Sequence, residues 1–359
     1  MVEPKIYLVL DNCFAIKRWV RPAHWLEISR DLGFKFVQAS TDNEIDPLFS
    51  PNDYMDDWFE EMRAAEKSTG AKVINFYTGY QTYRTVGLAH YDKRVRQKLL
   101  EGWFKPLIKR IAAIGAAGLG FSMFAFSEDV LRNPIAYKEK METVVKLLAE
   151  LSDFAFDNGK IDISVEQMYA PHQPPWTIDG AYKLLEDVYA ISKNPFYITL
   201  DVGHAVGQCR FLKPDFSKTK VNSEKQTYCA SEDIALYPYL FSEQKDCNPY
   251  NWLKELACFS PIIHLQQTDG ISSSHKAFSP ENNKDGIIKP AQVLKAIKSS
   301  YEKDHKAGLP AKSDNIYLSF EIFASNIEKN NEIIDKLKQS LKYWRKYIPE
   351  DGMPLSQLL

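Results

Sequence analysis

The sequence lacks the features that mark several broad classes of protein. None of its 359 residues belongs to an apolar run of about 18 residues, the length that a membrane-spanning helix needs. The formal net charge is only −2, so no global positive field favours nucleic acid or an anionic membrane. We therefore expect no nucleic-acid partner and no membrane association. The first residues, MVEPKIYLVLDN, are typical of a strand rather than of a signal peptide.

Cysteine and glycine motifs are also scarce. The five cysteines are odd in number and form no CxxC pair, which argues against a disulfide framework and a structural zinc site. This usage predicts a reducing, cytoplasmic location. The first apolar run is followed by Asp11-Asn12-Cys13-Phe14 rather than by GxGxxG, and this argues against a doubly wound dinucleotide-binding sheet.

The chain does contain a regular alternation of short apolar runs and amphipathic segments. Eight runs are expected to be strands: 6–10, 34–39, 72–77, 118–124, 162–166, 196–201, 262–265 and 316–321. Expected helices cover 53–68, 94–114, 136–158, 179–192, 289–303 and 326–347. Eight strand–helix repeats predict an α/β fold, a single (β/α)8 TIM barrel over residues 1–359. Segments 207–248 and 275–285 are expected to form long loops after the sixth and seventh strands.

Acidic residues and a histidine end four consecutive predicted strands. Glu166 ends the fifth and Asp201 the sixth, while His264 and Glu321 lie near the ends of the seventh and eighth. The carboxyl ends of barrel strands share one face, so these side chains are expected to converge. Buried carboxylates are costly without a compensating charge. The set predicts one divalent metal ion, Mn²⁺ or Mg²⁺, with Co²⁺ and Zn²⁺ as alternatives.

The same segments resemble a known family. The sequence around these positions reads Glu166-Gln-Met, Leu200-Asp-Val-Gly-His204, Ile263-His-Leu-Gln-Gln-Thr-Asp269 and Ser319-Phe-Glu321. It is similar to the xylose-isomerase-like TIM-barrel superfamily, in particular to its sugar and sugar-phosphate isomerase/epimerase branch, typified by D-tagatose 3-epimerases. The similarity covers residues 160–325. The first half of the chain matches the family only in its alternation of expected strands and helices.

The resemblance implies roles for individual residues. Glu166, Asp201, His264 and Glu321 would be the metal ligands, with Glu166 and Glu321 also the catalytic acid/base pair. His204, three residues after Asp201, would contact the substrate.

One position departs from the family pattern. His172 stands where sugar 3-epimerases often have a second glutamate, and a histidine would better suit a phosphate. His275 and Lys276, on the loop after the seventh strand, are further candidates to bind a phosphate. His24, after the first strand, is a candidate to bind the sugar.

Aromatic residues give weaker evidence about sugar binding and about a lid or a dimer contact. Trp19, Trp25 and Tyr80 could pack on a sugar face, although packing within the barrel is the favoured interpretation. The aromatic-rich segment 228–241 is a candidate for a lid or a homodimer contact.

The predicted function is a divalent-metal-dependent epimerase or isomerase of a ketose or ketose phosphate. It would act through a cis-enediolate, with Glu166 and Glu321 moving the proton. The alternatives are a metal-dependent lyase or dehydratase, an aldose–ketose isomerase of a free sugar, and a non-catalytic sugar-binding barrel. An abasic-site endonuclease would need more histidines than His204 and His264 provide, and a basic surface.

Overall fold

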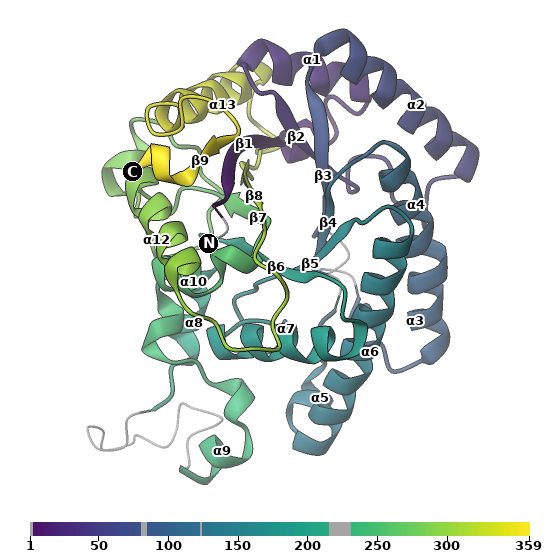
Figure 1. Ribbon diagram of the computed structural model, residues 1–359, viewed down its shortest axis with the longest axis vertical. Coiled ribbons are helices and arrows are strands. Elements are labelled where there is room, and N and C mark those ends of the chain that lie inside the picture. Colours follow the sequence, from purple (N-terminus) through teal and green to yellow (C-terminus); the bar gives the residue numbers. More distant parts are fainter. Residues whose placement is uncertain (1–2, 80–84, 123, 215–230) are drawn as a thin grey trace.

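A closed barrel of parallel strands forms the centre of the molecule, and helices surround it (Figure 1). The computed structural model describes residues 3–79, 85–122, 124–214 and 231–359. The barrel strands are β1 Lys5–Asp11, β2 Phe36–Ser40, β3 Lys72–Thr78, β4 Gly118–Phe121, β5 Asp162–Glu166, β6 Phe196–Asp201, β7 Ile262–Leu265 and β8 Asn315–Phe320.

Hydrogen bonding between neighbouring strands closes the barrel. Each strand pairs in parallel with the next along the chain, and β8 pairs with β1 over six residues. A short strand, β9 (Met353–Pro354), adds to the start of β1 in the antiparallel sense. The predicted (β/α)8 fold is therefore confirmed, with all eight expected strands present. β4 ends at Phe121, three residues earlier than expected.

The helices form an outer ring that follows the chain direction around the barrel (Figure 1). In the described ranges they are α1 Pro22–Leu32, α2 Asn52–Thr69, α3 Lys93–Leu99, α4 Lys105–Ala113, α5 Glu128–Leu131, α6 Pro134–Asp157, α7 Ile178–Ser192, α8 Ala205–Gln208, α9 Ser231–Leu236, α10 Pro249–Leu256, α11 Asn282–Asp285, α12 Pro290–Glu302 and α13 Asn330–Trp344. Short 3₁₀ turns lie at η1 Asn12–Ala15, η4 Cys209–Phe211, η5 Pro238–Leu240, η6 Gln244–Cys247, η7 Ala257–Phe259 and η8 Leu355–Leu358.

Helix α6 illustrates why the sequence forms these elements. Asn133 caps its first turn by accepting hydrogen bonds from two backbone N–H groups, and proline occupies the first helical position. Val144, Leu148 and Leu151 recur at helical spacing and are fully buried. One amphipathic face therefore attaches the helix to the barrel.

Two expected helices differ from the structure. The single helix expected over 94–114 is divided into α3 and α4 by a π-helical turn, η3 (Leu100–Phe104). The helix expected over 326–347 is α13, which is shorter at both ends. Helices α1 and α10 were not predicted, although each begins with a proline, a usual signal for a helix start.

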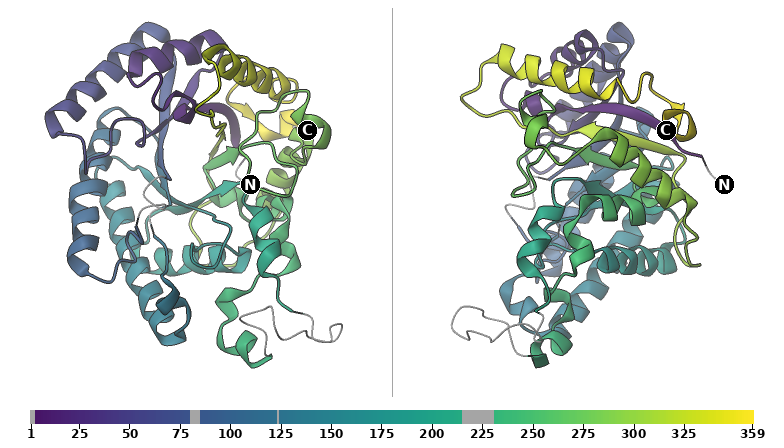
Figure 2. Two further views of the ribbon diagram at one scale, coloured as in Figure 1. Left: turned by 180° about the vertical axis from the view of Figure 1, so that it is seen from behind. Right: turned by 90° about the vertical axis from the view of Figure 1, so that its left-hand side faces the viewer.

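The carboxyl ends of the strands lie on one face of the barrel. Both chain termini lie at the opposite end, where β1 begins (Figure 2, right). Long connections follow β6 and β7, as predicted. Tyr80, Tyr228 and the first part of the proposed lid lie outside the described residues. None of the helices that the structure describes is long and apolar enough to cross a membrane.

Candidate metal centre and active site

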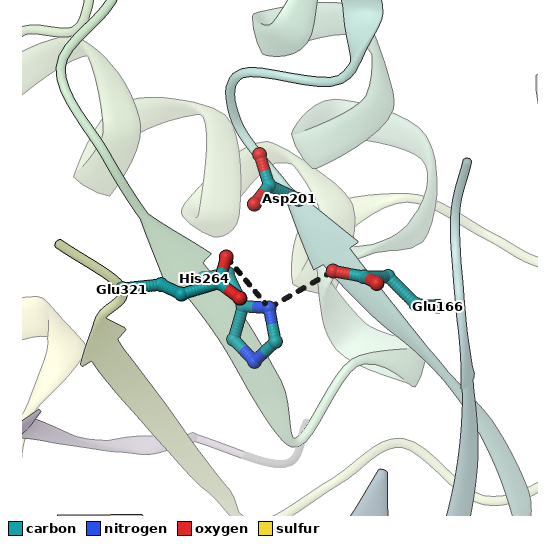
Figure 3. A group of neighbouring side chains, drawn as sticks. All are labelled: Glu166, Asp201, His264 and Glu321. Carbon is teal, nitrogen blue, oxygen red and sulfur yellow. Dashed lines mark hydrogen bonds and ion pairs between the residues drawn. The ribbon is translucent and has the colours of Figure 1, made fainter. Parts of the chain in front are cut away.

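Four polar side chains converge at the carboxyl end of the barrel (Figure 3). Glu166 and Asp201 are the last residues of β5 and β6, His264 is the third residue of β7, and Glu321 directly follows β8. All four are buried, and each offers one ligand atom that lies within 4.8 Å of the others. The prediction from strand ends therefore places these side chains correctly relative to one another.

His264 lies between two of the carboxylates. Its Nδ1 atom is 2.9 Å from Glu166 Oε1 and 3.5 Å from Glu321 Oε2, and Figure 3 shows the two glutamates approaching from opposite sides. Glu321 Oε2 is buried, and Nδ1 of His264 and Nδ1 of His275 lie 3.5 and 3.3 Å from it. A desolvated carboxylate oxygen of this kind is costly unless a positive charge faces it. The four residues therefore fit a divalent cation that prefers oxygen ligands.

The charges in this cluster shift one another's pKa values. Burial opposes a charged ring, but the carboxylates of Glu321 and Glu166 together with Asp201 raise the pKa of His264 to about 10. Burial raises the pKa of Glu321, whereas the nearby His264 and His275 lower it. Burial would also raise the pKa of Asp201, but His204, His275 and His264 outweigh it and lower that pKa to about 2. In the cation-free protein, protonated histidines thus balance part of the negative charge.

A cavity of about 220 Å³ lies beside the cluster, and Glu166 and Glu321 are the two members of the cluster that line it. Its lining consists of Asp11, Cys13, Ile16, Ser40, Asp42, Tyr77, Gly79, Ser122, Glu166, Met168, His204, His275, Glu321 and Phe323. Polar groups from the ends of the first four strands therefore face the acidic cluster across the cavity. A ligand held there would meet Glu166 and Glu321 on one side and a mixture of hydroxyl and carboxyl groups on the other.

Gln266 links two parts of the site. Its amide nitrogen donates to both carboxylate oxygens of Asp201, at 2.9 and 3.0 Å. Its amide oxygen accepts from the backbone N–H of His275 at 2.7 Å. His275 has a φ of 45°, an uncommon conformation for a side chain with a Cβ atom. Gln266 thus fixes Asp201 and holds the strained turn that carries His275.

Two of the predicted substrate-binding histidines line the cavity. His204 donates from Nδ1 to the carbonyl of Gln167 at 2.7 Å, and its Nε2 lies 3.9 Å from Asp201 Oδ2. His275 lies 3.3 Å from Glu321 Oε2 and stacks on Phe323, with ring centroids 3.9 Å apart. Burial opposes its charge, but Glu321 and the other carboxylates raise the pKa of His275 to about 9.

The other three predicted substrate-binding residues do not line the cavity. His24 is exposed on α1 rather than in a loop after β1. His172 is exposed on the connection after β5. Lys276 is exposed and forms an ion pair with Asp269 at 3.2 Å. Their positions in sequence suggested proximity to the site, but their side chains are not directed into it.

Two of the three aromatic candidates pack within the protein. Trp25 is fully buried, and its ring centroid lies 6.1 Å from that of Trp58. Trp19 lies against Phe14, with ring centroids 5.8 Å apart. The favoured interpretation, packing rather than sugar stacking, is therefore confirmed for Trp25, whereas Trp19 is partly buried at the edge of the core.

Tyr77, near the end of β3, was not predicted as a site residue. Its hydroxyl donates a short hydrogen bond to Glu166 Oε2, and its ring meets the His264 ring edge to face at 4.5 Å. Burial, followed by the charge of Glu166, raises the pKa of Tyr77 well above its usual value, so the hydroxyl stays protonated. Its position at a strand end was the signal available in the sequence.

Comparison with known protein families gives a TIM-barrel family that matches most of the chain. The model of the Xylose isomerase-like TIM barrel family matches residues 26–347. The chain is 24% identical over 344 residues to a Brucella abortus (strain 2308) protein named D-erythrulose 1-phosphate 3-epimerase. That match covers 95% of this chain and 96% of the relative.

Solved structures share the fold at low sequence identity. A candidate xylose isomerase from Rhodospirillum rubrum superposes with a TM-score of 0.74 at 19% identity, over 95% of this chain and 99% of that one. D-psicose 3-epimerase from Clostridium cellulolyticum H10, solved with D-tagatose, gives a TM-score of 0.59 at 11% identity, over 95% and 98%. At these identities the two structures establish likeness of fold alone.

Proposed function

The chain belongs to the xylose isomerase-like TIM-barrel family, and from this premise we propose that it is a metal-dependent epimerase of a short ketose or ketose phosphate. The observation that carries the proposal is the convergence of Glu166, Asp201, His264 and Glu321 in one buried cluster beside a cavity. The cavity, at about 220 Å³, is smaller than the roughly 300–1,000 Å³ of sites for drug-sized ligands. This size favours a short substrate.

The chemistry follows from the arrangement of the two glutamates. A divalent cation would supply Lewis-acid stabilisation of the negative charge that develops on the substrate oxygens. One of Glu166 and Glu321 removes the proton next to the ketose carbonyl, which gives a cis-enediolate. The other returns a proton. Because the two carboxyl groups approach from opposite sides, return to the opposite face inverts the stereocentre (Figure 3).

Three other residues orient the base or bind the substrate for this reaction. Tyr77 holds one oxygen of Glu166, which leaves Oε1 directed at the cluster. His204 and His275 line the same cavity and bind substrate oxygens. In the cation-free protein the neighbouring carboxylates raise the pKa of His275 to about 9, and a protonated ring at this position would suit a phosphate or a developing oxyanion.

The relative from Brucella abortus, named as acting on D-erythrulose 1-phosphate, guides the choice of first substrate. The test is Mn²⁺-dependent exchange of substrate protons with solvent deuterium, followed by NMR. The panel comprises D-erythrulose 1-phosphate, D-erythrulose, D-psicose and D-tagatose. We expect exchange at the carbon next to the carbonyl and appearance of the epimer. The ratio of kcat/KM for D-erythrulose 1-phosphate to that for D-erythrulose measures how much the phosphate group contributes to catalytic efficiency.

Controls separate this proposal from its alternatives. Glu321→Gln should lower the exchange rate by about 10²–10⁴-fold, the range of general acid–base catalysis, and its Mn²⁺ content should be measured alongside. An aldose product would identify an aldose–ketose isomerase, and an ultraviolet-absorbing product a lyase. Absence of Mn²⁺-dependent exchange with every ketose, in protein that binds Mn²⁺, would contradict the proposal.

A further inference from the structure

Gln38 is a fully buried amide inside the barrel that the proposed reaction does not use. It is the third residue of β2, and its Nε2 atom lies 2.9 Å from Nε2 of His264 on β7. Its Oε1 atom is buried and has no hydrogen-bond partner among the residues that the structure describes. Buried polar atoms without partners are rare in folded proteins, so this one calls for a physical reason.

The two edges of the His264 ring face different surroundings. Nδ1 faces Glu166 and Glu321, at 2.9 and 3.5 Å, and Nε2 faces Gln38. A histidine that binds a cation through Nδ1 carries its ring proton on Nε2. That N–H usually donates to an acceptor behind the metal site, which fixes the orientation of the ring. Gln38 stands at the place of that acceptor.

We propose that Gln38 is a positioning residue, which keeps Nδ1 of His264 directed at the cation by accepting the Nε2–H hydrogen bond through its amide oxygen. The inference rests on the metal centre of the proposed function. An amide has a donor and an acceptor of nearly equal size, so rotation about its last bond presents either one to the ring. Rotation places Oε1 beside Nε2 of His264, where it accepts from the ring N–H, and moves the amide nitrogen away from Asp11 to the position that Oε1 leaves.

Asp11 and the strand geometry support this role. Asp11 Oδ2 lies 2.5 Å from Gln38 Nε2, and Asp11 is the register neighbour of Gln38 on β1. The other carboxyl oxygen of Asp11 accepts from the Cys13 N–H at 2.7 Å. Burial raises the pKa of Asp11, which favours its neutral form, and a neutral carboxyl group donates to the amide oxygen after rotation. The register between β2 and β3 shifts at Val37/Gln38, and such irregularities re-aim side chains near active sites.

The test measures binding of Mn²⁺ alone to the full chain. Gln38→Met keeps the length of the side chain and removes both polar atoms, whereas Gln38→Glu keeps an acceptor for the ring N–H. Gln208→Met is the matched control, because Gln208 is also fully buried with an unpartnered Oε1, and its hydrogen bonds go to the carbonyls of Met168 and Trp176. Thermal unfolding without Mn²⁺ checks that each variant folds, and Gln38→Leu, which also removes both polar atoms, replaces Gln38→Met if the latter does not fold.

We expect Gln38→Met to weaken Mn²⁺ binding by about 10–100-fold, the usual effect of losing the outer partner of a metal-bound histidine. Gln38→Glu should restore most of the affinity, and Gln208→Met should leave it unchanged. Wild-type affinity in Gln38→Met, or an equal loss in Gln38→Met and Gln208→Met, would overturn the inference and leave the proposed function intact. If the unaltered chain binds no Mn²⁺, the metal centre itself is wrong and the inference falls with it.

Discussion

Tyr77 shows how a single hydroxyl group controls the orientation of the proposed base. Tyr77→Phe removes the hydrogen bond to Glu166 Oε2 but keeps the ring that packs on His264. A hydrogen bond to a charged group contributes about 1.5–3 kcal/mol, so we expect kcat to fall by about 10–100-fold. Steady-state kinetics on the active ketose, with Mn²⁺ content measured in parallel, checks this prediction.

The control for that variant is another buried tyrosine. Tyr301 donates to the carbonyl of Ser313 at 2.6 Å and does not line the cavity. Tyr301→Phe should lower stability by about 1 kcal/mol and leave kcat unchanged. Equal losses of kcat in the two variants would show that the effect of Tyr77 is general damage to the barrel.

The raised pKa of His264 predicts that metal binding depends on pH. In the cation-free protein the neighbouring carboxylates raise its pKa to about 10, so the ring is protonated at neutral pH. A cation needs the lone pair of Nδ1, and binding must therefore release a proton. We expect Mn²⁺ affinity to rise with pH between about 6 and 9, up to tenfold per pH unit. Calorimetry in buffers of different ionisation enthalpy measures the released proton, and affinity independent of pH would contradict the prediction.

At the scale of elements, the turn after β6 depends on close contact between a glycine and Gln266. A Cβ atom on Gly203 would lie 2.3 Å from the Gln266 side-chain carbon, and Gln266 anchors both Asp201 and the His275 turn. Gly203→Ala should therefore displace Gln266 and destabilise the fold by about 1–3 kcal/mol. Mn²⁺ affinity should fall as well, because Asp201 loses its anchor. Denaturant unfolding and Mn²⁺ titration measure the two effects.

A matched glycine variant distinguishes this contact from a general effect of added volume. A Cβ on Gly102, in the π-helical turn, would meet only the flexible side chain of Lys98, at 3.3 Å. Gly102→Ala should be neutral or stabilise by up to about 1 kcal/mol, because alanine favours helix over glycine. A loss of Mn²⁺ affinity in Gly102→Ala would count against the specific role of Gly203.

At the scale of the whole molecule, the proposed cation would tie together the ends of β5, β6, β7 and β8. Mn²⁺ at about 100 times its Kd should stabilise the fold by about 2.7 kcal/mol and raise Tm by several degrees. In the cation-free protein, the raised pKa of His264 contributes stability that is complete below about pH 6.5 and is lost as pH rises through about 10. The Tm gain from Mn²⁺ should therefore grow with pH.

Thermal unfolding with EDTA or Mn²⁺ at a series of pH values measures this gain. Asp201→Asn, which lacks one carboxylate ligand, should largely lose it. A gain of the same size in Asp201→Asn would place the cation elsewhere on the protein.

The barrel and the set Glu166, Asp201, His264 and Glu321 could be predicted from the sequence by itself. Each strand has a local apolar run, and each of these side chains ends or nearly ends one. In a parallel barrel all strand ends lie on one face, so four local signals determine a common site. The helix boundaries were less predictable, since the π-helical turn at Leu100–Phe104 has no local signal of that kind.

Which other residues surround the cluster depends on contacts between strands that are far apart in the sequence. Tyr77 and Glu166 are 89 residues apart, and Gln38 and His264 are 226 apart. Closure of the barrel brings the early strands opposite the late ones, and no local pattern records contacts across that interior. Conversely, His172 lies on a connection at the correct end of the barrel, but its side chain is exposed. Chain position fixes where a strand end lies, whereas packing decides which loop side chains turn inward.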